Sequence, residues 1–366
     1  MYSNGSVLPQ GASTLTDDSR PGPLTHYLDV QRLAFAPLLF QAARAARDMG
    51  VLAALDAAGS DGLQPAEVAE RAGVSLYAAR VLLEACLSLD LCRAEGWRFR
   101  LTRAGRLVLH DEMTRVNMEF VHHVCYQGAF SLERSLREER PVGLGVFGPW
   151  ETVYEGLAQL PPDAQRSWFA FDHFYSDGVF AAALDVLLEG APRRILDVGG
   201  NTGRFAIAAA RRDPRVEVTI LDHPGQLAMA AREAAAAGVG GRVTGVSMEL
   251  RDHALAFPAG FDVVWMSQFL DCFPEADIVG LLRRGRAALA PEGRLYVNEP
   301  YWDRQPNEVG RLCLHGTSLY FTAIANGQSR MYHSEDLARC IGAAGLVIEA
   351  DRPLGSTHTL FVCRAP

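Results

Sequence analysis

Short apolar runs alternate with helical stretches along the C-terminal half of the chain, and this alternation constrains the fold more than any other feature. The runs are RRILDVGG, VEVTILD, GRVTGV, FDVVWMS and GRLYVNE, and the stretches between them include GRFAIAAARR and PGQLAMAAREAAAAG. Such alternation predicts a parallel, doubly wound sheet. The last two runs, LVIEAD and TLFVCR, are separated only by a loop and should form an antiparallel edge. We therefore predict an α/β domain with a Rossmann-like seven-stranded sheet over residues 191–366.

The N-terminal half has a different texture. Residues 1–23 are rich in Ser, Gly, Pro and Asp, and we expect a flexible tail there. Helical periodicity is then followed by two short β-like runs around a turn at Glu95-Gly96, an arrangement typical of a winged helix. We predict a mainly helical, winged-helix-like domain over 24–110. A helical linker rich in aromatic residues, over 111–190, is expected to contribute to a substrate pocket.

Composition excludes several classes of function. The net charge is -8, without a long run of either sign, which argues against nucleic acid as the main partner. No apolar run approaches the roughly 18 residues of a membrane-spanning helix, and the N-terminus lacks the apolar core of a signal peptide. The seven cysteines are widely spaced and form no CxxC pair. This pattern indicates reduced thiols in a cytoplasmic protein and no structural zinc site.

A glycine-rich turn follows the first predicted strand, in the segment ILDVGGNTG. Gly199, Gly200 and Gly203 allow the backbone to adopt positive φ angles and to approach a ligand closely. The spacing does not fit GxGxxG. Asp197 also places a negative charge at the loop, which disfavours a pyrophosphate. A carboxylate there suits a cationic ligand instead, such as the ammonium and sulfonium groups of S-adenosylmethionine.

Further acids follow the next two strands. Asp222 ends VEVTILD, where an acid can accept hydrogen bonds from both hydroxyls of a ribose. Glu249 can bind an adenine amino group, and Leu250 can cover the ring. His223 is expected to cover the adenosine, and Ser267, at the end of the fourth strand, to contact the cofactor. Together these residues predict a nucleoside site without a phosphate subsite.

The chain resembles the class I S-adenosylmethionine-dependent small-molecule O-methyltransferases of the caffeate and hydroxyneurosporene type, including antibiotic-tailoring members. The resemblance rests on the winged-helix-like half, the DVGGxxG loop, the Asp222-His223-Pro224 segment and Glu249, and it extends over nearly the whole chain. It implies S-adenosylmethionine as the cofactor and a homodimer formed through the N-terminal domain. It also implies O-methylation of a small, aromatic, secondary-metabolite-type acceptor.

The chain departs from this family at the catalytic residues. After the fourth strand the family usually carries His-Asp-Trp, whose His is the general base, whereas this chain carries Asp271-Cys272-Phe273. Phe273 can still stack in the place of the Trp. Glu299 matches the first of two acids that orient the base. The segment of the second acid reads Gly327–Met331 here and contains no acid.

The missing His leaves several chemistries open. A phenol and an aspartate differ by about 6 pKa units at their reference values, or about 8 kcal/mol for proton transfer. Asp271 could therefore act as the base only if burial raised its pKa. The alternatives are methylation of a ring carbon or of a keto-acid α-carbon, or another base such as His315. A homologue that binds the cofactor without transferring methyl groups is a further alternative.

Two segments are candidates for contacting the acceptor. In the family, residues 307–326 face the substrate, which makes His315 and Tyr320 candidates. The aromatic cluster of 168–175 contributes His173, Phe171 and Phe174 as candidates. Asp271 and His315 lack a convincing third ligand, so no metal is expected.

The competing class is a DNA-binding regulator. The segment WRFRLTRAGR is typical of a wing and carries four arginines that could contact phosphates. These arginines are Arg98, Arg100, Arg103 and Arg106. The acidic balance of the whole chain disfavours this function, and no membrane partner is expected either.

Overall fold

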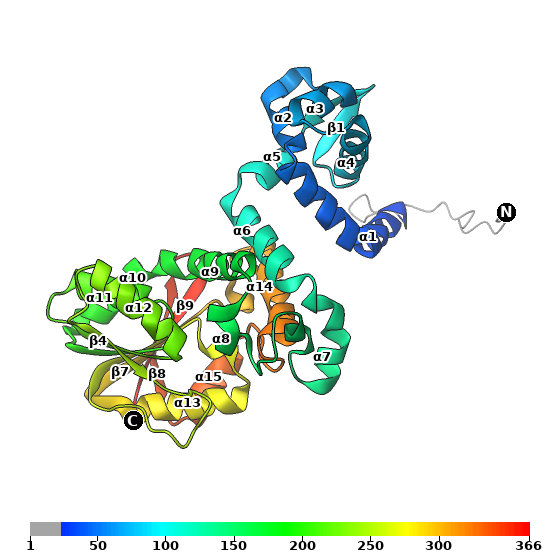
Figure 1. Ribbon diagram of the computed structural model, residues 1–366. Coiled ribbons are helices and arrows are strands. Elements are labelled where there is room, and N and C mark those ends of the chain that lie inside the picture. Colours follow the sequence, from blue (N-terminus) through cyan, green and yellow to red (C-terminus); the bar gives the residue numbers. More distant parts are fainter. Residues whose placement is uncertain (1–22) are drawn as a thin grey trace, which may run out of the picture. The chain divides into compact units, whose positions relative to one another are not determined.

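The computed structural model describes residues 23–366 (Figure 1). The predicted tail, 1–23, lies outside the described residues except for Pro23, with which the first helix begins. The chain divides into two compact units between Arg115 and Val116. Among the described residues, no helix is both long and apolar enough to cross a membrane.

The first unit is a helical bundle with a β-hairpin. Gly50, with φ 79°, separates the first two helices. Ser75 caps the fourth helix by accepting a hydrogen bond from the Ala78 amide. The elements are α1 (Pro23–Asp48), α2 (Val51–Ala58), α3 (Pro65–Ala72), α4 (Leu76–Ser88), β1 (Cys92–Glu95), β2 (Arg98–Leu101) and α5 (Arg103–His110). The predicted helical N-terminal domain and its hairpin are thus confirmed.

The hairpin carries fewer arginines than the sequence suggested. Thr102 accepts a hydrogen bond from the Gly105 amide and so starts α5, which places Arg103 and Arg106 on a helix and not on a wing. The two arginines of β2 are engaged within the unit. Arg98 donates to the carbonyls of Asp61 and Gly62, and Arg100 pairs with Glu95.

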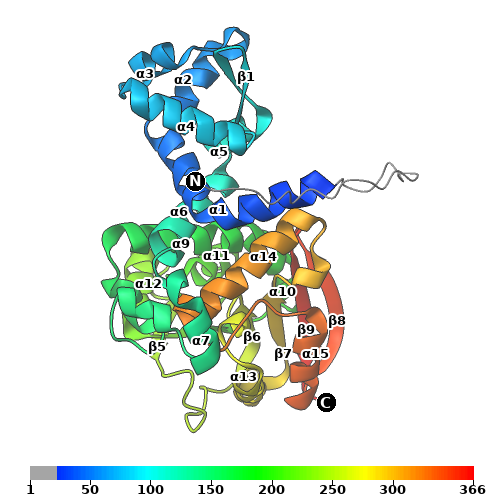
Figure 2. The same cartoon turned by 90° about the vertical axis from the view of Figure 1, so that its right-hand side faces the viewer.

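The second unit is built on a seven-stranded sheet of order β5-β4-β3-β6-β7-β9-β8. The strands are β3 (Arg194–Val198), β4 (Glu217–Asp222), β5 (Val243–Ser247), β6 (Phe261–Ser267), β7 (Leu289–Glu299), β8 (Val347–Leu354) and β9 (His358–Arg364). The first five pair in parallel, whereas β9 runs antiparallel to both β7 and β8. Figure 2 shows β6, β7, β9 and β8 side by side. The predicted doubly wound sheet with an antiparallel edge is confirmed.

Helices cover both faces of this sheet (Figure 1). They are α10 (Phe180–Leu187), α11 (Arg204–Arg212) and α12 (Pro224–Ala236) on one face, and α13 (Glu275–Ala288) and α15 (Ser334–Ala343) on the other. The remaining helices are α6 (Glu112–Phe120), which spans the division between the two units, α7 (Leu132–Glu138), α9 (Pro162–Ser176) and α14 (Glu308–Tyr320). Short turns include α8 (Val153–Gly156), the 3₁₀ turn η8 (Leu270–Cys272) and two π-helical turns, η2 (Val121–Cys125) and η10 (Phe321–Ala325).

Side chains that alternate along the central strands pack into two hydrophobic cores, one on each face of the sheet. Ile195 and Trp265 point into the core under α10, α11 and α12. Their neighbours Leu196 and Met266 point into the core under α13 and α15. Because both faces of these strands are buried, their sequences are continuous apolar runs. Each fully buried apolar side chain stabilises the folded state by about 1.5–3 kcal/mol.

Strand order also predicts where a ligand binds. The chain winds outward from β3 through β4 to β5, and then returns to form β6 on the other side of β3. In open sheets of this kind, ligands bind beyond the carboxyl ends of the strands, at the point where the winding reverses. That point lies between the ends of β3 and β6, next to the glycine-rich turn.

Candidate active site

The glycine-rich turn closely follows the end of β3 and leads into α11. Gly199 has φ 75° and Gly203 has φ 77°, a region that side chains rarely adopt. A Cβ atom on Gly199 would lie 2.3 Å from the Phe269 ring. On Gly200 it would lie 2.6 Å from a carboxylate oxygen of Asp197. Glycine is therefore required at 199 for both conformation and space, at 203 for conformation and at 200 for space.

Two buried carboxyl groups flank the turn. Asp197 is 3% exposed, and its Oδ2 has no hydrogen-bond partner among the described residues. Burial, with a smaller effect of Asp222, raises the pKa of Asp197 to about 8. Asp222, at the end of β4, accepts hydrogen bonds from the amides of Asn201 and His223 at 2.8 and 2.7 Å. Its pKa is also raised by burial.

This arrangement fits a ligand that brings positive charge and N–H or O–H donors. An unpartnered buried acceptor costs free energy until a donor reaches it, and a cation returns the carboxyl to its ionised form. A pyrophosphate would add negative charge beside Asp197 and Asp222. The donor and acceptor chemistry of the turn therefore fits the ammonium and ribose groups of S-adenosylmethionine.

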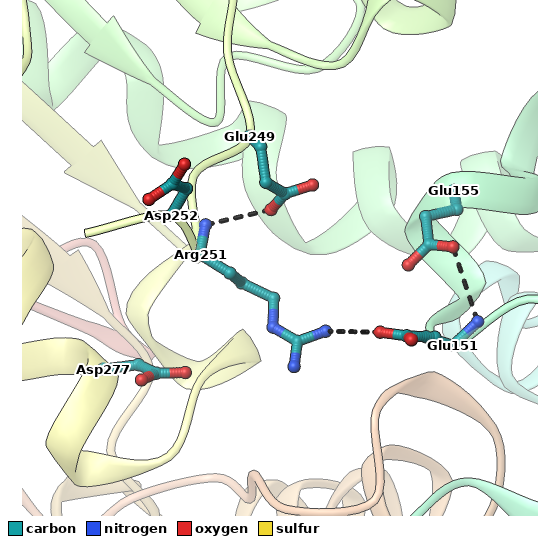
Figure 3. Close-up of a pocket in the computed structure, with 6 residues that line it drawn as sticks. All are labelled: Glu151, Glu155, Glu249, Arg251, Asp252 and Asp277. Carbon is teal, nitrogen blue, oxygen red and sulfur yellow. Dashed lines mark hydrogen bonds and ion pairs between the residues drawn. The ribbon is translucent and has the colours of Figure 1, made fainter. Parts of the chain in front are cut away.

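A cavity of about 410 Å³ opens beside the third predicted acid, Glu249 (Figure 3). Glu249 accepts a hydrogen bond from the Arg251 amide, and the Arg251 side chain reaches towards Glu151 at 3.7 Å. Leu250 is buried, and its carbonyl accepts a hydrogen bond from Arg284. The lining residues are Glu151, Glu155, Glu249, Arg251, Asp252 and Asp277.

The remaining predicted cofactor residues lie at or beyond the ends of β4 and β6. His223 precedes α12, which begins with Pro224. Ser267 ends β6 and accepts a hydrogen bond from Asn298 at 2.9 Å. Phe273 is buried, and its ring packs edge-on against Phe269. The side-chain roles of these residues stay predictions.

The turn after β6 carries Asp271. The residue is 7% exposed, and burial raises its pKa to about 7, with a further contribution from the negative charge of Asp172. Glu299, at the end of β7, is 2% exposed and accepts hydrogen bonds from the amides of Phe269 and Leu270 at 3.1 and 2.9 Å. Burial and the nearby Asp271 raise the pKa of Glu299 well above its usual range.

Glu299 therefore holds the backbone of the turn directly. A glutamate that stays protonated can lie beside Asp271 without repelling its ionised form, because only one of the two carries charge. The geometry thus brings together the two residues that the sequence proposed as a base and its orienting acid.

The predicted acceptor residues lie in different surroundings. Tyr320 is buried, and its hydroxyl accepts a hydrogen bond from Trp168 at 2.7 Å. Phe171 stacks on Phe120, with ring centroids 3.9 Å apart. Phe174 packs edge-on against Tyr175.

The two candidate histidines lie on different helices and have different neighbours. The Nδ1 atom of His173 lies 3.6 Å from Asp172 and 3.7 Å from Asp177. His315 is exposed on α14, and its ring lies 5.4 Å from that of Trp302. Within residues 23–366 no group of three or more His, Cys, Asp or Glu is arranged to hold a metal ion.

Sequence reasoning missed three polar residues beside the turns. Asn201 donates from its side chain to Asp172 at 3.0 Å and so joins the glycine-rich turn to α9. The buried Tyr154 hydroxyl lies near Cys272, and burial raises its pKa well above the usual range. The clue to Asp172 was a single acid inside the aromatic run WFAFDHFY.

Comparison with known proteins adds family information to this geometry. Residues 28–99 match the Dimerisation2-like domain, and residues 196–295 match a methyltransferase domain. The chain is 30% identical over 295 residues to 3-amino-4-hydroxybenzoate 4-O-methyltransferase of Streptomyces cremeus, covering 78% of this chain and 76% of that protein. It is 26% identical over 277 residues to L-tyrosine C(3)-methyltransferase of Streptomyces lavendulae, covering 74% of each.

A solved structure shares the fold. It is an O-methyltransferase from neocarzinostatin biosynthesis in complex with S-adenosylmethionine and 2-hydroxy-5-methyl naphthoic acid. The TM-score is 0.66 at 22% identity, over 89% of this chain and 96% of that one. The chain belongs to the S-adenosylmethionine-dependent small-molecule O-methyltransferase family, in which a dimerisation domain precedes the methyltransferase domain, and S-adenosylmethionine is its cofactor.

Proposed function

We propose that the enzyme methylates a phenolic oxygen of a small, aromatic, secondary-metabolite-type acceptor, with Asp271 as the proton acceptor. The observation that carries this proposal is the buried position of Asp271 at the switch point of the sheet, with its pKa raised to about 7. The similarity to a 3-amino-4-hydroxybenzoate 4-O-methyltransferase, and to a solved O-methyltransferase in complex with 2-hydroxy-5-methyl naphthoic acid, supports the aromatic class.

The cofactor residues take the roles that the sequence predicted. Asp197 would bind the ammonium group beside the glycines of the turn, and Asp222 would accept hydrogen bonds from the ribose hydroxyls. Glu249 would bind the adenine amino group beside Leu250. His223, Ser267 and Phe273 would enclose the adenosine. The orphaned Asp197 Oδ2 supports the first of these roles.

The raised pKa makes proton transfer to Asp271 feasible. Against a phenol of pKa near 10, an acceptor of pKa about 7 leaves a gap of about 3 units, or about 4 kcal/mol. An unperturbed aspartate would leave about 8 kcal/mol. When bound, S-adenosylmethionine supplies a methyl group on a positively charged sulfur. An acceptor atom aligned about 3 Å from the methyl carbon can take this group, and the sulfur leaves. Asp271 takes the phenolic proton, and Glu299 holds the turn that carries it.

Methylation of a ring carbon is the second candidate. The observation that favours it is the similarity to the L-tyrosine C(3)-methyltransferase, together with the replaced His. A carbon ortho to a phenol is nucleophilic, and Asp271 could remove the phenolic or the ring proton. Keto-acid methylation and cofactor binding without transfer remain further alternatives.

Assembly and location complete the proposal. We propose a homodimer formed through the domain of residues 24–110, with the linker of 111–190 lining the acceptor pocket of the 191–366 domain. The match to a dimerisation domain supports this assembly. The free cysteines of the described residues support a cytoplasmic location. Light scattering after size-exclusion chromatography tests the dimer, which a monomer at micromolar concentration would contradict.

The decisive experiment uses S-adenosylmethionine labelled with ¹³C in the methyl group. Phenols, hydroxybenzoates, L-tyrosine and aromatic keto acids are supplied in parallel, and the products are analysed by NMR. Label at a methoxy carbon supports oxygen methylation, and label at an aryl methyl supports the second candidate. Tight cofactor binding without labelled product from any acceptor would support the non-methylating alternative.

A further inference from the structure

Hydrogen bonds hold the backbone on both sides of Asp271. Gln268 adopts φ 45°, an unfavourable angle for a residue other than glycine, and its amide donates to the Asn298 carbonyl. Glu299 binds the next two amides. Beyond Asp271, the Tyr332 hydroxyl donates to the carbonyl of Phe273 at 2.7 Å. The turn therefore keeps a strained conformation because its neighbours fix it.

On this second side the Sγ of Cys272 lies 3.4 Å from Asp271 Oδ1, and Asn326 holds the backbone of that cysteine. Asn326 directly follows the π-helical turn η10, and its side-chain Nδ2 donates to the Cys272 carbonyl at 2.9 Å. Its Oδ1 accepts hydrogen bonds from the amides of Gln328 and Ser329. Because an amide oxygen can only accept, these two contacts fix which way the amide points. The nitrogen must then face Cys272.

Ser329 completes the contact. The residue is buried, and its hydroxyl lies 2.7 Å from Asn326 Nδ2 as the acceptor. It also lies in the segment Gly327–Met331, which corresponds by resemblance to the segment of the family's second orienting acid and contains no acid here. Here that segment orients the turn through Asn326 and a backbone carbonyl, without a carboxylate.

We propose that Asn326, supported by Ser329, is a positioning residue that sets the reach of the Asp271 carboxylate. This inference rests on the proposed role of Asp271 as the base. The aspartate side chain has only two rotatable bonds, so the position of its carboxylate depends mainly on the backbone. A displacement of about 1 Å at a reacting group can reduce the rate about a hundredfold. A hydrogen bond to the neighbouring carbonyl limits that displacement.

A double-mutant cycle tests the inference. We compare Asn326→Ala in the wild-type background and in the Asp271→Asn background, measuring kcat and the Kd for S-adenosylmethionine. Gln305→Ala is the matched control, because Gln305 is also buried and donates from its amide to two backbone carbonyls, those of Tyr301 and Thr357. Thermal unfolding of every variant reports on folding.

The expected result is a tenfold to hundredfold loss of kcat in the wild-type background and less than a twofold loss in the Asp271→Asn background, since residues that act together are not additive. Cofactor Kd should change less than threefold, and Gln305→Ala should retain kcat. Equal losses in both backgrounds, or no loss in the first, would overturn the inference.

The design distinguishes three further outcomes. If Asn326→Ala does not fold, Asn326→Asp replaces it. That variant retains the acceptor contacts to residues 328 and 329, loses the donor and places a carboxylate oxygen against the Cys272 carbonyl, so the same cycle then decides. If Asp271→Asn alone retains full kcat, Asp271 is not the base, and both the proposed function and this inference fail. If Asp271→Asn lowers kcat but the cycle shows no coupling, only the inference fails.

Discussion

Replacing Asp271 by asparagine tests the base most directly. The substitution keeps the size of the side chain and removes its ability to take a proton. General-base catalysis contributes about 10²–10⁴-fold, so kcat should fall within that range. The Kd for S-adenosylmethionine should stay within about threefold, because the carboxylates that we propose to bind the cofactor lie on other strands.

The pKa of Asp271 determines how the rate should depend on pH. With a pKa of about 7, the ionised fraction of Asp271 in the free enzyme rises about tenfold, from about one-tenth at pH 6 to about nine-tenths at pH 8, and the rate should rise with it. Because burial raises this pKa, the active ionised form is lost as the pH falls. A bound sulfonium favours the carboxylate and moves the rising limb towards lower pH.

The assay follows formation of S-adenosylhomocysteine by liquid chromatography from pH 5.5 to 8.5, with both substrates saturating. The wild-type enzyme should show one rising limb at or below about pH 7, and Asp271→Asn should lack it. A variant that retains more than a third of wild-type kcat, or the same limb, would refute the assignment of the base.

Three further predictions concern the cofactor site and the fold. Asp222→Ala should weaken S-adenosylmethionine binding at least thirtyfold by calorimetry; unchanged affinity would remove Asp222 from the site. Gly199→Ala should lower the free energy of unfolding by about 2–4 kcal/mol in urea melts, because of the positive φ at this position and the clash with Phe269. The control is Gly342→Ala, whose Cβ would meet nothing within 4 Å and which should be neutral or stabilising. Because Asp197 has a raised pKa, the free enzyme should lose stability as pH rises from about 4 to 8, and S-adenosylmethionine should raise Tm more at pH 8 than at pH 6. An equal Tm increase at both pH values would contradict that linkage.

Much of the fold could be predicted from local sequence patterns. The apolar runs, the helical spacing between them and the glycine-rich turn are properties of short segments. They place Asp197, Asp222 and Glu249 at the ends of neighbouring strands without knowledge of tertiary contacts. The order of the strands then follows from the restricted topologies of doubly wound sheets.

Contacts between distant segments could not be predicted in the same way. Helical periodicity does not say which face of α14 is covered, and His315 lies on an exposed face beside Trp302. The pairing of Asn201 with Asp172 joins a loop to a helix from the preceding linker. The start of α5 at Arg103 depends on the Thr102 cap, a short-range cue that the β-like pattern obscured.

The central claim is that a turn flanked by buried carboxyl groups binds a positively charged nucleoside that lacks a phosphate. Isothermal titration of the wild-type enzyme with S-adenosylmethionine and with NAD⁺, in buffers of different ionisation enthalpy, tests it most directly. The account predicts micromolar affinity for S-adenosylmethionine with release of protons at pH 7, as Asp197 ionises, and no binding of NAD⁺. Preference for the dinucleotide, or no binding of S-adenosylmethionine at millimolar concentration, would contradict it.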